Sequence, residues 1–168
     1  MSLPEWAQVS PGRRAHIGRV VDLLDSWADA MGVSPKERAR WARAGWLHDA
    51  LRDASLASPT AHGPAAADRA AADGERDRGV LDAVRYHTIG YSGWDDVGRM
   101  LYLADFLEPG RGQTPDLADR ADLVQRVPPE RDAVLRDVAR RRIEWMLRSG
   151  WQLPAETVDF WNSLAGKR

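Results

Sequence analysis

The chain contains no cysteine, which excludes disulfide bridges, zinc–thiolate sites and cysteine catalysis, so any metal ion must be bound through nitrogen and oxygen. No apolar run approaches the roughly 20 residues of a membrane-spanning helix. The N-terminal residues lack the basic and apolar regions of a signal peptide. The formal net charge is −1, so the chain lacks the excess of basic residues that is typical of a dedicated nucleic-acid binder. We therefore expect a cytoplasmic protein with no membrane and no nucleic-acid partner.

The length of 168 residues fits a single domain over 1–168, with a core at about 11–165. Apolar residues recur with helical spacing nearly throughout, and no stretch alternates like a strand. The pattern therefore predicts an all-α protein. The predicted helices cover residues 11–31, 35–51, 64–72, 80–87, 97–107, 128–149 and a last segment from about 154.

A carboxylate interrupts one of the apolar helices. Asp105 follows Leu101 by four residues and Val97 by eight, which places it on the buried face of that helix. An unpaired buried carboxylate costs several kcal/mol. A positive group must therefore face Asp105, either a metal cation or an arginine.

The four histidines also occupy inward positions. His16 shares a helix face with Val20, while His87 ends a predicted helix and His62 lies in the string AHGPAAA. Each has an ordinary explanation when taken alone, as a helix-start residue or as a C-terminal histidine favoured by the helix dipole. The pair His48–Asp49, at the end of an apolar helix, could likewise be a simple helix terminus. Together, imidazoles and carboxylates dispersed along a helical chain favour a metal-activated hydrolase.

Two arginines lie close to these residues in the sequence. Arg52 is one turn after Asp49, and Arg111 follows the break at Pro109–Gly110 just beyond Asp105. Arginine offers the planar, bidentate donors that suit phosphate. The alternative is a surface arginine, which for Arg111 would pair with a surface-exposed Glu108. We interpret the arginine cluster at 140–142 as a solvated helix face.

The order of these residues resembles a known family. His16, His48–Asp49 and Asp105 reproduce the H…HD…D signature of the HD-domain metal-dependent phosphohydrolases. The strings AHGPAAA, AVRYHTIGYSGW, LYLADFLEPGR and WNSL are similar to the YqeK-type bacterial enzymes, which hydrolyse diadenosine tetraphosphate symmetrically to two ADP. The resemblance spans residues 16–164 and implies a compact HD-domain helical bundle that acts on a nucleotide.

The resemblance also implies roles for individual residues. A divalent transition metal, iron most readily, with manganese or another divalent ion as the alternative, would bind to His16, His48, Asp49 and Asp105. His62 and His87 would border the phosphates or a second metal, with Thr88 against them and Arg111 on phosphate.

In the corresponding hydrolysis, a metal makes hydroxide available near neutral pH. Asp49 would bind the metal and orient the nucleophile, and Arg52 and Arg111 would stabilise the charge on the phosphoryl oxygens. His62 and His87 are candidates for protonating the leaving phosphate, because histidine titrates near neutrality.

The chain also departs from the YqeK-type pattern near the substrate pocket. The segment between Asp49 and His62 is shorter, Arg52 replaces the usual lysine, and Trp94 replaces a methionine. Three functions therefore stay open: a diadenosine tetraphosphate hydrolase, an HD phosphohydrolase of another nucleotide or phosphate ester, and a non-catalytic nucleotide sensor. The eight tryptophans leave room for a homodimer contact.

Overall fold

The computed structural model describes residues 2–110 and 118–165, and that part of the chain contains helices and no strand. The all-α prediction is confirmed. The helices of the described residues are α1 (Pro11–Met31), α2 (Pro35–Leu47), α3 (His62–Ala72), α4 (Arg78–Tyr86), α5 (Asp96–Leu107), α6 (Arg120–Arg148) and α7 (Ala155–Ala165). None of them is long and apolar enough to cross a membrane.

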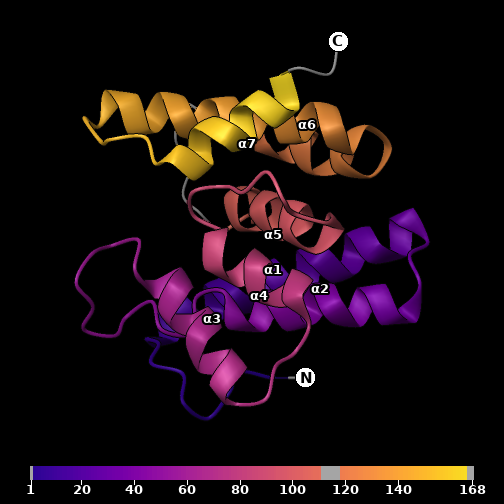
Figure 1. The fold of residues 1–168 in the computed structure, drawn as a ribbon. Coiled ribbons are helices and arrows are strands. Elements are labelled where there is room, and N and C mark those ends of the chain that lie inside the picture. Colours follow the sequence, from indigo (N-terminus) through magenta and orange to yellow (C-terminus); the bar gives the residue numbers. More distant parts are fainter. Residues whose placement is uncertain (1, 111–117, 166–168) are drawn as a thin grey trace.

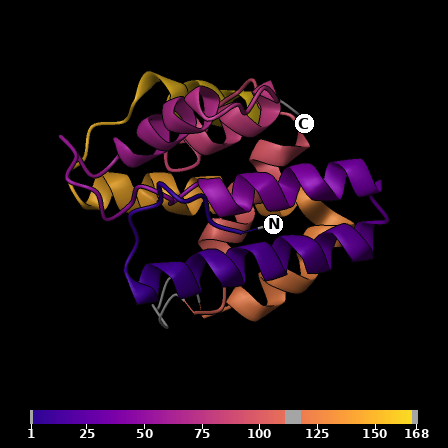
Figure 2. The same cartoon turned by 90° about the horizontal axis from the view of Figure 1, so that it is seen from below.

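Helix α5 is the centre of the fold. In Figure 1 it lies between a layer formed by α1 to α4 and a layer formed by α6 and α7. It contacts α1, α2, α4 and α6, and nine of its 12 residues are buried. Figure 2 shows α1 and α2 side by side as an antiparallel pair on one face. Any polar residue on the inner faces of these helices is therefore withdrawn from bulk water.

Capping residues fix the start of the first two helices. The side chain of Ser10 accepts a hydrogen bond from the backbone N–H of Arg13, and Ser34 does the same for Glu37. A proline occupies the first turn of each helix, as expected where the N–H has no helical partner. With its start fixed at Ser10, α1 directs His16 and Val20 to the core.

The second helix is shorter than predicted. It ends at Leu47 rather than near Leu51, and the chain continues in tight turns through residue 53. The N-terminal segment is the physical reason. The N–H of Gln8 binds the carbonyl of Ala50 at 2.7 Å, and the carbonyl of Gln8 accepts from Asp53 at 3.3 Å. The carbonyl of Ala50 and the N–H of Asp53 are therefore not available for helical hydrogen bonds. As a result, Arg52 does not lie on a helix face.

Helix α6 begins earlier than predicted. Pro128–Pro129 was expected to open it, but the helix starts at Arg120 and both prolines lie inside it. They produce a kink, with φ −131° and ψ 32° at Glu130. The upstream turns persist because they pack on α1, where the Trp27 indole donates to the carbonyl of Val124 at 3.0 Å. The other predicted helix bounds agree within two residues.

A glycine allows α3 to approach α4 closely. A Cβ atom at Gly63 would lie 2.8 Å from the carbonyl oxygen of Arg85 and 2.9 Å from that of Val84. Both distances are shorter than ordinary contacts, and both neighbours are backbone atoms. Gly63 therefore lets the start of α3, with His62, reach the end of α4, where His87 follows.

We predict that Gly63→Ala lowers the free energy of unfolding by about 1–3 kcal/mol, because the added methyl group must push α3 and α4 apart. Gly18→Ala is the matched control, since a Cβ there meets nothing within 4 Å. Alanine is favoured over glycine inside a helix by about 0.5–1 kcal/mol, so the control is expected to gain stability. Urea unfolding with chelator present measures both. Equal effects in the two variants would contradict the close-approach explanation.

Candidate metal centre

The side chains of six polar residues meet inside the bundle, and each of these residues is no more than 5% exposed. They come from α1, α5, the start of α3 and the residues that follow α2 and α4. Their ligand atoms form two groups, and within each group these atoms lie within 4.8 Å of one another. Group 1 is His16, His48 and Asp105, and group 2 is Asp49, His62 and His87.

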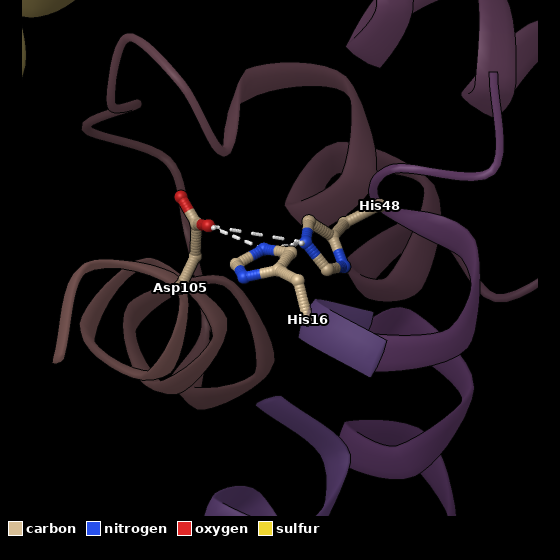
Figure 3. A group of neighbouring side chains, drawn as sticks. All are labelled: His16, His48 and Asp105. Carbon is tan, nitrogen blue, oxygen red and sulfur yellow. Dashed lines mark hydrogen bonds and ion pairs between the residues drawn. The ribbon is translucent and has the colours of Figure 1, made fainter. Parts of the chain in front are cut away.

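Group 1 joins α1, the end of α2 and α5 (Figure 3). The Nε2 atom of His16 lies 3.2 Å from Oδ1 of Asp105 and 3.4 Å from Nε2 of His48. Nε2 of His48 lies 3.9 Å from the same Asp105 oxygen. Two ring nitrogens and one carboxylate oxygen therefore face a common point.

Group 2 has the same composition. Nε2 of His62 and Nε2 of His87 are 3.0 Å apart, and they lie 3.1 and 3.4 Å from Oδ1 of Asp49. The hydroxyl of Thr88 is 3.2 Å from Nε2 of His87. The predicted neighbours His62, His87 and Thr88 are thus brought together beside the residues of group 1.

Asp49 connects the two groups. While its Oδ1 atom faces group 2, its Oδ2 atom lies 3.6 Å from Nε2 of His16 and 3.7 Å from Nε2 of His48. One carboxylate therefore presents an oxygen atom to each group. Asp49 could therefore contribute one oxygen atom to a cation in each group.

The imidazole rings are oriented by their other nitrogen atom. In three of them Nδ1 lies 2.7–2.8 Å from the backbone carbonyl three residues earlier: His48 with Gly45, His62 with Pro59, and His87 with Val84. A carbonyl can only accept, so Nδ1–H donates and the neutral ring carries its lone pair on Nε2. This contact fixes the tautomer that binds metal ions.

His16 is oriented by a carboxylate instead. Its Nδ1 atom is 3.0 Å from Oε1 of Glu108, which is 1% exposed. Glu108 also accepts from Arg19 at 2.6 Å and from the backbone N–H of Gly110 at 2.7 Å. Burial acts to raise the pKa of Glu108, but the hydrogen bonds from Arg19 and His16 outweigh it, so the pKa lies below its usual range. Glu108 is therefore not the surface partner that the alternative for Arg111 required.

The donor atoms of both groups fit a cation. Lone pairs of two Nε2 atoms face each other within about 3 Å beside a carboxylate oxygen, an arrangement that is repulsive in the absence of a positive charge. Imidazole nitrogen and carboxylate oxygen together suit divalent transition metals. Burial acts to raise the pKa of Asp49, but its interactions with the facing imidazoles of His48, His62 and His87 hold that pKa well below its usual range. Asp49 is thus an anion ready to bind metal.

Asp105 pairs with an arginine, which is one of the two positive partners expected for this buried carboxylate. Nη2 of Arg142 lies 2.9 Å from Oδ2 of Asp105, while Oδ1 faces His16. The guanidinium stacks on Tyr102 at 4.3 Å and on Phe106 at 5.1 Å. The side chain of Arg142 is 13% exposed, so its assignment to a solvated helix face was wrong.

The sequence offered a signal for Arg142 that was not used. Along α6 the buried residues Leu135, Val138 and Met146 lie at spacings of three or four that include position 142. Arg13 was also missed, although it lies one turn before His16. Its Nη1 atom is 2.7 Å from Oδ2 of Asp49. Arg13 and Arg142 thus place a positive charge beside each of the two inward carboxylates, Asp49 and Asp105.

A cavity of about 900 Å³ opens over both groups. Its size suits a small-molecule ligand, and its wall is rich in arginine. Arg52 lines it while donating to the carbonyl of Pro59 at 3.2 Å. Arg111 lies outside the described residues. The arginines that line the cavity are Arg13, Arg19, Arg52, Arg120, Arg141 and Arg142.

The buried imidazole of His48 makes the stability of the metal-free protein depend on pH. Burial lowers the pKa of His48 to about 4, below the ordinary value of 6.5. Between these values the unfolded chain binds a proton that the folded protein does not, so stability is lost as the pH falls. We predict a loss of roughly 2–3 kcal/mol between about pH 7 and pH 4.5 in urea unfolding of chelated protein.

His48→Asn is the control for this prediction, because asparagine keeps a donor for the Gly45 carbonyl and does not titrate. The variant is expected to have a flatter stability profile over the same pH range. The same slope in both proteins would show that His48 does not cause the dependence.

Comparison with known proteins agrees with this geometry. The sequence model of the HD domain family matches residues 13–127, which is more than half of the chain. The crystal structure of a predicted HD superfamily hydrolase involved in NAD metabolism, from Clostridium acetobutylicum, superposes with a TM-score of 0.78. The match covers 95% of this chain and 92% of that chain at 19% identity, so it shows a shared fold.

Two curated relatives carry the name symmetrical bis(5'-nucleosyl)-tetraphosphatase. One, from Bacillus subtilis, is 45% identical over 38 residues, which is 23% of this chain and 20% of the relative. The other, from Staphylococcus aureus, is 27% identical over 109 residues, which is 64% of this chain and 55% of the relative. The matched segments thus span about half or less of these relatives. The resemblance inferred from the motifs is confirmed at the level of the family, and this chain belongs to the HD domain family.

Proposed function

We propose that this chain is a metal-dependent phosphohydrolase that cleaves a phosphoanhydride bond in a nucleotide, with diadenosine tetraphosphate as substrate and two ADP as products. The observation that carries the proposal is the position of Asp49. It lies between two groups of inward-facing Nε2 atoms at the base of an arginine-lined cavity. The names of the two curated relatives support the choice of substrate.

In this proposal His16, His48 and Asp105 would hold one divalent ion together with Asp49, and His62 and His87 would hold a second, also with Asp49. Iron is the preferred ion, and manganese is the alternative. Ions bound there would lower the pKa of bound water and neutralise the phosphoryl oxygens. The buried carboxylate of Glu108 would make His16 a better ligand by accepting its Nδ1 proton.

The geometry favours a ligand role for His62 and His87 over proton donation. Both Nδ1 atoms donate to backbone carbonyls, and both Nε2 atoms point at Oδ1 of Asp49. A ring whose Nε2 binds a cation cannot deliver a proton from that atom. Thr88 lies against both rings, where its hydroxyl could donate to a phosphoryl oxygen.

The arginines supply the phosphate-binding part of the proposal. Arg13 and Arg142 already bind the carboxylates of Asp49 and Asp105, and Arg52 lines the same cavity. Guanidinium groups in a partly enclosed site stabilise charge on transferred phosphoryl groups. Arg111, which directly follows the cavity-lining Gly110, is assigned the same role by the family resemblance.

The metal assignment predicts that two variants lose different amounts of bound metal. Wild-type protein is expected to bind about two divalent ions per chain, one for each group. Asp105→Asn should keep about one, because it removes the anionic ligand of group 1 alone. Asp49→Asn should keep less than one, because both groups lose an oxygen. Metal analysis after dialysis in chelator-free buffer measures the ratio.

Asp53→Asn is the matched control, since Asp53 lines the cavity but belongs to neither group. It accepts a hydrogen bond from the Ser10 backbone at 2.7 Å, which asparagine can retain. Its metal content should equal that of the wild type. If Asp105→Asn keeps the full content, Asp105 is not a ligand.

The substrate assignment predicts ADP as the main product from diadenosine tetraphosphate, with turnover that depends on added ferrous iron or manganese. Asp49→Asn should lose at least a hundredfold in turnover, because neither group keeps its full set of ligands. Chromatography of the products is the measurement. ATP plus AMP would contradict symmetrical cleavage.

The same experiment separates the other two functions. Turnover of a mononucleotide without turnover of diadenosine tetraphosphate would identify a different HD phosphohydrolase. Nucleotide binding without turnover of any substrate would identify a sensor. Both outcomes reject the proposed reaction, although they leave the metal assignment standing.

A further inference from the structure

Two tryptophans at the wall of the cavity are unusually exposed. Trp145, near the end of α6, is 50% exposed and Trp151, in the connection to α7 (Figure 1), is 38% exposed. Their rings meet edge to face, with centroids 5.1 Å apart and an interplanar angle of 62°. Both side chains line the same cavity as His16 and Asp49. We call these two residues the Trp pair.

The backbone holds the Trp pair in place. The N–H of Trp151 binds the carbonyl of Met146 at 2.9 Å, and the N–H of Gly150 binds that of Leu147 at 3.1 Å. Gly150 has a left-handed φ of 71°, so these are the two hydrogen bonds of a Schellman helix end. The turn therefore places Trp151 against Trp145 before any ligand binds, which reduces the entropic cost of binding.

Along α6, the residues that line the cavity change from arginines to apolar side chains. Arg141 and Arg142 line the cavity, and Trp145 and Met146 line it one turn further along. A helical turn advances about 5.4 Å, so a cationic segment is followed directly by an aromatic one. A nucleotide has the same order, because its anionic phosphates adjoin an aromatic base.

We propose that the Trp pair is a stacking subsite for the adenine base of a nucleotide whose phosphates lie among the cavity arginines. The proposal deepens the proposed function and rests on it for the class of ligand. Indole rings can stack on any nucleobase. Proteins commonly bind nucleobases through exposed aromatic side chains that lie beside a positively charged groove. The subsite would favour substrates that carry a nucleoside over phosphate compounds without one.

The rival occupant is a second copy of this chain. The exposed residues Leu147 and Val158 are near the Trp pair in sequence, and they would extend an apolar contact between copies. Neither lines the cavity, whereas both tryptophans do. The residues that line the cavity include six arginines and four carboxylates, so the adjoining wall carries a net positive charge that complements phosphates rather than an apolar surface. These two observations favour the nucleotide.

The test compares binding of ADP and of pyrophosphate by titration calorimetry, using manganese-loaded protein. The two probes share a diphosphate and differ in the adenosine. Trp145→Ala and Trp151→Ala should each weaken ADP binding by about five- to a hundredfold, as expected for the loss of one stacked base, and leave pyrophosphate binding unchanged. Trp151→Phe should recover most of the affinity. Leu147→Ala, which removes a side chain that is 58% exposed and lies outside the cavity, should affect neither probe.

Several results would overturn the subsite. ADP binding could be unchanged in both alanine variants, both probes could weaken equally, or the wild type could bind no ADP. A change in oligomeric state on sedimentation, with ADP affinity unchanged, would assign the Trp pair to a contact between copies. If diadenosine tetraphosphate is not hydrolysed but ADP binding still depends on the Trp pair, the proposed reaction fails and the subsite stands.

Discussion

The burial of Asp49 and Asp105 at the centre of a helical bundle is the constraint on which the rest of the structure depends. Carboxylates removed from water destabilise a fold unless positive groups or hydrogen-bond donors surround them. Here the compensation comes from several helices at once. Arg13 on α1 and Arg142 on α6 each bind one of the two carboxylates, and α5 carries Asp105 through the middle of the fold. The bundle is thus organised around its charges as much as around its apolar core.

The same constraint explains how the imidazoles are held. Helix ends leave carbonyl groups without a helical partner, and the end of a helix is where such groups are available to a side chain. His48 and His87 follow α2 and α4 directly and donate to carbonyls of their last turns. The early end of α2 therefore matters for the site. In a longer helix, the backbone groups near His48 and Asp49 would form helical hydrogen bonds. Local chain geometry thus sets the tautomer of the rings.

The helices and the all-α class could be predicted because each depends on patterns within about 15 residues. The convergence of the four histidines, which are spread from His16 to His87, was expected only from the family resemblance. The partners of those residues could not be predicted. Arg142 reaches Asp105 from 37 positions away, and Glu108 reaches His16 from 92. Such contacts depend on how α6 bends at Pro128–Pro129 and how α5 crosses α1, which no local pattern specifies. The end of α2 was missed for a related reason, since residues near Gln8 compete for its backbone.

The shared carboxylate of Asp49 has a consequence for occupancy. Because its two oxygens face different groups, a metal ion in either group of the proposed centre would alter the charge that is available to the other group. Such an interaction is a thermodynamic linkage, and it is reciprocal: whatever factor the first ligand applies to the affinity of the second, the second applies to the first. The two groups of the proposed centre would therefore not bind metal ions independently. As the metal concentration rises, the two groups would fill as a coupled pair. The population of protein with only one group filled would depend on the side chain of Asp49.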